Sequence, residues 1–102
     1  MNYAAFNEVR ALIGTERTFG LLSDFARDLG HQFRSEAPND LALDAHAMIS
    51  SAGVFGFGEL VCACRDVEEA CRTGCEIGAL RTRLDQARRD TLNEIDWLRT
   101  AG

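Results

Sequence analysis

Residues 44–56 are Asp44-Ala45-His46-Ala47-Met48-Ile49-Ser50-Ser51-Ala52-Gly53-Val54-Phe55-Gly56, and the spacing of the apolar side chains predicts an α-helix. At about 100° per residue, the apolar positions in and just before this segment fall within about 80° of one another and form a stripe that faces a core. They are Leu41, Ala45, Met48, Ala52 and Phe55. His46 points about 130° away from the middle of the stripe, so we expect it on the solvent side.

Small residues surround His46 on the predicted helix. Ala42 lies one turn before it, and Ser50 and Gly53 lie one and two turns after it. Exposed helix faces usually carry long polar side chains, which favour the helix and keep it soluble, whereas serine and glycine weaken a helix. We therefore interpret the low surface around His46 as access for a large partner. The other histidine, His31, is interpreted as a surface residue without a role.

Length and composition indicate a single domain, residues 1–102, with one core. The chain is 46% hydrophobic and 26% charged, which is typical of soluble proteins. We expect no membrane partner and a cytoplasmic location, because the sequence has neither a long apolar run nor a signal-peptide pattern. The net charge of −5 argues against a nucleic-acid partner.

Four cysteines, Cys62, Cys64, Cys71 and Cys75, do not have the spacing of zinc modules or of thioredoxin-like motifs. On a helix, Cys64 and Cys71 share a stripe with Leu60 and Val67, so we interpret both as small core residues. We expect no metal site and, in a reducing compartment, no disulfide.

Helical periodicity recurs along the whole chain, and no segment has the pattern of a strand. The predicted helices cover residues 2–13, 18–34, 40–54, 57–73 and 76–99. Gly14 and Gly74 are expected to end helices, Thr15 and Asn39 to cap them, and Pro38 to mark a break. Trp97 is expected to pack against the rim of the core. The predicted fold is all-α, an up-and-down antiparallel four-helix bundle with a short extra N-terminal helix.

The segment His46–Ser51, followed in step by Phe55, Gly56 and Leu60, resembles the helix that carries the active histidine in histidine-containing phosphotransfer (HPt) domains of bacterial phosphorelays. That family has a histidine, any residue, leucine, lysine, glycine and serine, then an apolar residue, glycine and a later leucine. The motif spans residues 46–68, and the number and lengths of the flanking helices agree with the family. The resemblance implies the four-helix fold and a phosphorylated histidine at position 46.

Two positions depart from the family pattern: Ile49 stands where a lysine is expected, and Ser50 where a glycine is expected. In the family the lysine is thought to balance phosphoryl charge. Arg65 and Arg72, seven residues apart on the next helix, are candidates for supplying that charge here. Glu68 is a polar neighbour at a position where the family often has glutamate or glutamine, and Cys64 likewise fits the family.

The resemblance implies a phosphorelay intermediate of two-component signal transduction. His46 would accept a phosphoryl group from the aspartate of one receiver domain and pass it to another, because a neutral imidazole is nucleophilic near pH 7. The chain has no Gly-rich phosphate loop, so we expect no kinase or ATPase activity of its own. No cofactor is expected in this chain, since Mg²⁺ would be supplied by the receiver.

The partners implied are receiver domains of response regulators and of hybrid histidine kinases, which would meet a monomer of this chain. Leu43, Ile49, Ser50 and Gly53 are the predicted partner-binding residues around His46. Ile49 is equally well interpreted as the edge of the core stripe. Two other functions remain open at this stage: a helical adaptor that binds a receiver or kinase without carrying phosphate, and a metal- or redox-sensing bundle that uses the cysteines.

Overall fold

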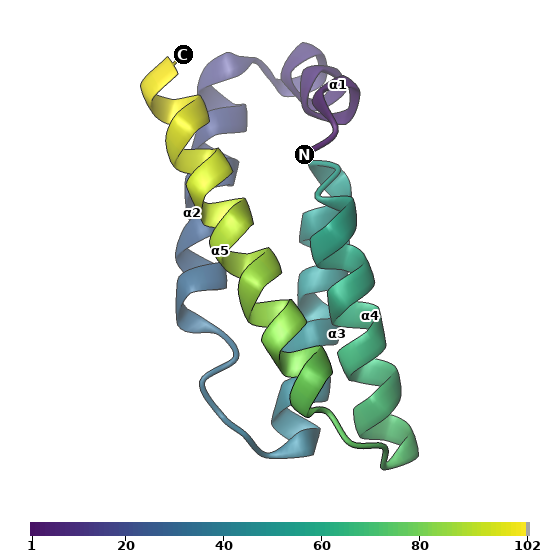
Figure 1. The fold of residues 1–102 in the computed structure, drawn as a ribbon. Helices are drawn as coiled ribbons and strands as arrows, with labels where there is room; N and C mark the ends of the chain where they lie inside the picture. Colours follow the sequence, from purple (N-terminus) through teal and green to yellow (C-terminus); the bar gives the residue numbers. More distant parts are fainter. Residues whose placement is uncertain (102) are drawn as a thin grey trace.

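The computed structural model describes residues 1–101, and over that range the chain is all-helical with no strand. The five helices are α1 (Tyr3–Ile13), α2 (Thr15–His31), α3 (Pro38–Val54), α4 (Gly58–Thr73) and α5 (Gly78–Ala101). Figure 1 shows α2 to α5 running along the length of the molecule and α1 lying across one end. The predicted all-α class is confirmed. Among the described residues, no helix combines the length and the apolar character that crossing a membrane requires.

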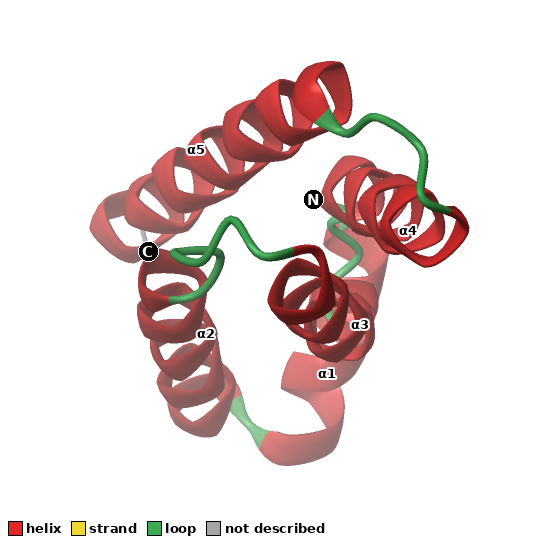
Figure 2. Ribbon diagram, turned by 90° about the horizontal axis from the view of Figure 1, so that it is seen from below, coloured by secondary structure: helices red, strands yellow, loops and turns green. Residues whose placement is uncertain are grey.

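The core is built from one apolar stripe on each helix. Helices α3 and α4 form the most extensive pair, α5 packs on α4 and α2, and α1 packs on α2 and α3. Figure 2 shows α3 and α4 adjacent and nearly end-on, with α5 running obliquely past them. The predicted α3 stripe is buried as expected: Leu41, Ala45, Met48, Ala52 and Phe55 are each at most 4% exposed. His46 is therefore on the opposite face of a well-anchored helix.

The turn between α3 and α4 is short and tightly packed. The rings of Phe25 and Phe57 stack with centroids 5.5 Å apart, which fixes the turn against α2. Gly56 has φ +73°, and a Cβ atom there would lie 2.3 Å from Cβ of Asn2, so only glycine fits. The Asn2 N–H donates to the Gly56 carbonyl at 2.7 Å. This turn sets the relative rotation of α3 and α4.

The connection between α2 and α3 differs from the prediction at Phe33. We predicted helix as far as Arg34, but α2 ends at His31. Phe33 is buried at 2% exposure with φ +65°, a conformation that a bulky residue adopts only when its surroundings hold it there. Its N–H donates to Asp44 Oδ2 at 3.0 Å, and the Arg88 guanidinium lies 5.2 Å from its ring centroid. Tertiary contacts therefore override the helical periodicity here.

The predicted N-cap residues of α2 and α3, Thr15 and Asn39, are both wrong. Gly14, not Thr15, is the N-cap residue of α2, and Thr15 is already helical. Asn39 is likewise inside α3, which begins at Pro38 with Ala37 as its N-cap residue and no side-chain cap. Proline suits the first helical position because it has no N–H to leave unpaired. Gly74 does end α4 in the left-handed conformation, as predicted.

The first residues of α1 and α5 and the packing of Trp97 also differ from the prediction. Asn2 lies outside α1 and caps it, accepting hydrogen bonds from the N–H groups of Ala4 and Ala5. Helix α5 starts at Gly78 rather than at residue 76 and runs past residue 99. Trp97 is 58% exposed, so the expected packing against the rim of the core is wrong. Its position falls outside the buried stripe of Leu84, Ile95 and Leu98.

Replacing Arg88 by methionine is expected to destabilise the fold by about 2–3 kcal/mol, because the C-terminal carbonyl groups of α2 lose a charged donor. Arg88 donates to the carbonyls of Leu29 and Gln32 at 2.8 and 3.2 Å, and its side chain is only 17% exposed. Urea denaturation followed by circular dichroism measures the loss. The matched control is Arg89→Met, which removes only an exposed bond to Gln86 and should change stability by less than about 0.5 kcal/mol. Equal losses in both variants would contradict this role.

Candidate functional site

His46 lies on the solvent face of α3. Its side chain is 76% exposed, as the helical spacing predicted. The neighbouring residues on α3 are small: Ala42 is half-buried, and Ser50 and Gly53 are exposed. A Cβ atom built at Gly53 meets no described atom within 4 Å, so internal packing does not require a glycine there. The ring can therefore be approached by a body much larger than a small molecule.

Glu68 of α4 holds one nitrogen of the His46 ring. His46 Nδ1 and Glu68 Oε1 are 2.9 Å apart, and the glutamate side chain is 25% exposed. An ionised carboxylate only accepts hydrogen bonds, so this contact favours the imidazole tautomer with its proton on Nδ1. The lone pair is then on Nε2, which makes no hydrogen bond with any residue from 1 to 101. The arrangement yields an accessible nucleophilic nitrogen.

From the sequence we predicted Glu68 as a polar neighbour of His46, but not the direct hydrogen bond between them. One signal was available. Residues 46 and 68 lie 11 positions before and 11 positions after Phe57, in the turn between the two helices. Residues equidistant from the turn of a helical hairpin lie at similar heights, so a pair of this kind is expected to meet if both face the same side.

Leu43 and Ile49 occupy different environments, although both were predicted to bind a partner. Leu43 is 69% exposed and, with His46 and Glu68, lines an open hollow whose other residues are Asn39 and Ala42. Ile49 is half-buried and packs against the core, which favours its interpretation as the edge of the stripe. The hydrophobic surface beside His46 is therefore provided by Leu43 more than by Ile49.

Arg65 and Arg72 lie three residues before and four residues after Glu68, on the same face of α4. Both are exposed, and no hydrogen bond joins either guanidinium to His46 in the described part of the chain. Arg72 instead forms an ion pair with Glu69 at 2.6 Å. Both arginines thus lie on the face of α4 that carries Glu68, but neither guanidinium is hydrogen-bonded to the His46 ring.

The four cysteines are free thiols in different environments. Cys64 is fully buried, Cys71 is half-buried, and Cys62 and Cys75 are exposed. Burial raises the pKa of the Cys64 thiol to about 12, with Arg88 opposing and Glu68 adding to the shift. Burial also raises the pKa of Cys71. Within residues 1–101, no three His, Cys, Asp or Glu side chains come together as possible metal ligands.

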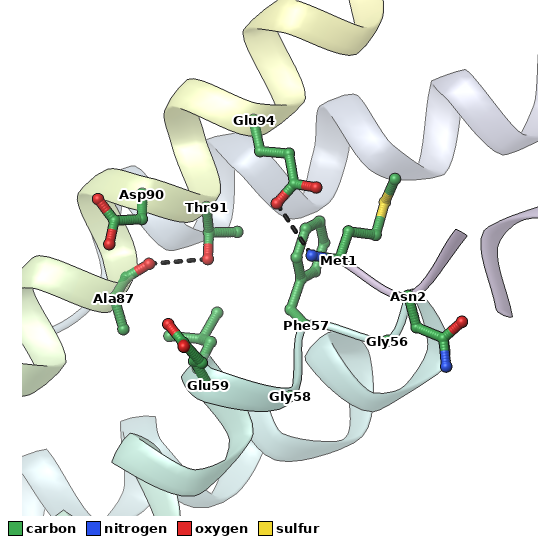
Figure 3. Close-up of a pocket in the computed structure, with 11 residues that line it drawn as sticks. Met1, Asn2, Gly56, Phe57, Gly58, Glu59, Ala87, Asp90, Thr91 and Glu94 are labelled. Atoms are coloured by element: carbon green, nitrogen blue, oxygen red, sulfur yellow. Dashed lines mark hydrogen bonds and ion pairs between the residues drawn. The ribbon is translucent and has the colours of Figure 1, made fainter. Parts of the chain in front are cut away.

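A second hollow, drawn in Figure 3, is lined by the first residues of α4, Gly58, Glu59 and Leu60, together with residues of α5 and the N-terminus. The Met1 ammonium group pairs with Glu94 at 3.0 Å, and the Thr91 hydroxyl donates to the Ala87 carbonyl at 2.7 Å. The carboxylates that line this hollow are Glu59, Asp90 and Glu94. Neither histidine of the chain lines this hollow.

Comparisons with known proteins identify no relative of this chain: no family model, curated protein or solved structure matches it.

The four cysteines are expected to differ in their rates of thiol labelling at about pH 8. Cys62 and Cys75 should react rapidly with a disulfide reagent and Cys71 more slowly, because only the thiolate reacts. Cys64 should react only after unfolding, since its raised pKa leaves it protonated and its burial excludes the reagent. The rates are measured by mass spectrometry of digested protein. Rapid labelling of Cys64 in the folded protein would contradict its place in the core.

Proposed function

We propose that this chain is an HPt-like phosphorelay intermediate, which accepts a phosphoryl group on His46 from a receiver-domain aspartate and passes it to another receiver domain. The observation that carries the proposal is the exposed His46 ring, whose Nδ1 is held by Glu68 at 2.9 Å. This contact leaves Nε2 as the nucleophile on an open helix face. The match of residues 46–68 to the motif of HPt domains supports the same assignment.

The transfer step follows from this geometry. The Nε2 lone pair attacks the phosphorus of an aspartyl phosphate, a P–N bond forms, and the P–O bond to the aspartate breaks with its electron pair left on the carboxylate. The ring then carries a positive charge, which the Glu68 carboxylate balances across the Nδ1–H bond. Mg²⁺ and the remaining charge stabilisation would come from the receiver. Phosphoryl transfer of this kind needs no kinase or ATPase activity in this chain.

The arrangement of the helices supports the fold that this function requires. Helices α2 to α5 run lengthwise in Figure 1 and are joined by short connections, which is the pattern of an up-and-down antiparallel four-helix bundle. Helix α1 would be the extra N-terminal helix. His46 would then lie on the flank of the bundle, where a globular receiver can reach it without obstruction from the loops.

The docking surface would be the exposed line of α3 beside His46. Leu43, Ala47, Ser50 and Val54 follow one another at spacings of three and four residues, and all are exposed and uncharged. Leu21 of α2 extends the apolar surface next to Val54, with which it lines a hollow between the two helices. A small apolar patch of this kind suits a transient partner. We propose receiver domains of response regulators and hybrid kinases as partners of a monomeric, cytoplasmic chain.

Phosphotransfer from a phosphorylated receiver domain in the presence of Mg²⁺ is the direct test of the proposed function. Wild-type protein and His46→Gln are each mixed with a panel of receiver domains that carry labelled phosphate, and the label on each protein is followed by gel electrophoresis. Wild type should gain label and His46→Gln should gain none. The matched control is His31→Gln, which removes an exposed histidine on α2 that contacts Arg34, and it should gain label like wild type.

Two results would contradict the relay. Equal labelling of wild type and His46→Gln would place the phosphoryl group elsewhere. Binding to receivers without any transfer of label would favour the adaptor, a helical protein that binds a receiver or kinase and carries no phosphate.

Introducing a charge at Leu43 is expected to weaken binding to a receiver that transfers to wild type. Leu43→Glu should raise the Kd about tenfold or more, because an apolar contact is replaced by a carboxylate that must lose its water on docking. Trp97→Glu is the control, since it places the same charge at an exposed apolar position of α5. Calorimetric titration measures both affinities, and circular dichroism checks that helicity is kept. Equal weakening by both variants would exclude Leu43 from the docking surface.

A further inference from the structure

The charged groups around His46 bear on how long it could keep a phosphoryl group. The ring has a carboxylate, Glu68, as its direct partner, and the residue three positions after it on α3 is the uncharged Ile49. The cations on the same face of α4 are Arg65 and Arg72, each about one turn from Glu68, and Arg72 is paired with Glu69. Among the described residues, no cation makes a hydrogen bond or ion pair with the His46 ring, whose partner is Glu68. The group in direct contact with the ring is therefore a hydrogen-bond acceptor on Nδ1 and not a cation.

The protonation of Nδ1 decides how easily a phosphoryl group leaves Nε2. When the P–N bond breaks, its electron pair returns to Nε2. If Nδ1 carries a proton, the leaving group is a neutral imidazole; if Nδ1 is bare, the leaving group is an imidazolate anion, which is a far poorer one. An anionic acceptor at 2.9 Å keeps the proton on Nδ1 through a charge-assisted hydrogen bond.

We infer that Glu68 sets the lifetime of phosphorylated His46: its carboxylate retains the Nδ1 proton and so keeps the P–N bond ready to break. Glu68 is a positioning residue, since it acts through the ring and does not touch the phosphoryl group. The inference rests on the proposed function and adds a property to it. A chain with this pair of residues passes its phosphoryl group on quickly and is poorly suited to storing it.

The test loads the protein without any partner. Wild type, Glu68→Gln and the control Glu59→Gln are incubated with inorganic phosphoramidate, the donor is removed, and the decay of the phosphorylated species is followed by ³¹P NMR. At about pH 8, the phosphohistidine of Glu68→Gln should have a lifetime about three- to tenfold longer than that of wild type, because a neutral amide no longer favours a proton on Nδ1. Glu59→Gln makes the same change of net charge nine residues earlier on α4 and should decay like wild type.

The pH profile separates this role from a structural one. At about pH 5, both phosphorylated rings are protonated whatever their partner, so wild type and Glu68→Gln should decay within about twofold of each other. Their lifetimes should diverge as the pH rises, with wild type remaining labile to higher pH. A lifetime difference of the same size at every pH would overturn the inference, as would a Glu68→Gln lifetime equal to or shorter than that of wild type.

The same samples test the regiochemistry. Nitrogen–phosphorus couplings should place the phosphoryl group on Nε2 of His46 in wild type. A phosphoryl group on Nδ1 would contradict the hydrogen bond on which the inference depends. Failure of His46 to accept a phosphoryl group from phosphoramidate would overturn the inference as well, because it requires Nε2 to be a reactive nucleophile. Failure of the proposed function gives a different result. The protein would then accept a phosphoryl group from phosphoramidate and show the lifetime effect of Glu68, but it would transfer phosphoryl groups to and from no receiver domain.

Discussion

Close packing of α3 against α4 is the constraint on which the rest of the structure depends. Both helices turn small side chains into the core: Ala45 and Ala52 on α3, and Ala63 and Cys64 on α4, are all at most 1% exposed. The distance between helix axes falls as the side chains at the contact become smaller. Glu68 can reach His46 from the neighbouring helix because the two backbones lie near each other. The chemistry at the surface is thus a consequence of small residues in the core.

The parts that could be predicted from the sequence are those governed by local spacing. The buried stripe of α3 and the exposure of His46 follow from the helical repeat, and Gly74 ends α4 for a local reason. Phe33 could not be placed in this way. Its periodicity continues that of α2, but contacts with Asp44 and Arg88, which are distant in sequence, hold it outside the helix. Long-range contacts of this kind leave no mark on the local pattern.

The candidate site likewise combines a feature that local spacing predicts with one that depends on a long-range contact. Its exposed histidine was found from α3 alone, whereas the hydrogen-bond partner of that histidine lies 22 residues away and depends on how two helices are joined. Ile49 illustrates a limit of helical angles, because a residue beside the stripe is assigned to core or surface only by what packs over it. Ile49 packs against the buried cluster, so a residue that looked available to a partner belongs partly to the interior. Leu43, one turn before Ala47 and uncovered, remains accessible.

The short turn at Phe55–Phe57 has a consequence for how this chain can diverge. One residue added to the turn would have to be accommodated beside the buried rings of Phe55 and Phe57. Any rotation of α4 that resulted would carry Glu68 away from the imidazole, since one residue of a helix corresponds to about 100° about its axis. Asn2 leaves no room for a side chain at Gly56, so even the composition of the loop is restricted. Insertions between these two helices should therefore be far less tolerated than insertions between α4 and α5, where no residue pair of the site is set by the loop length.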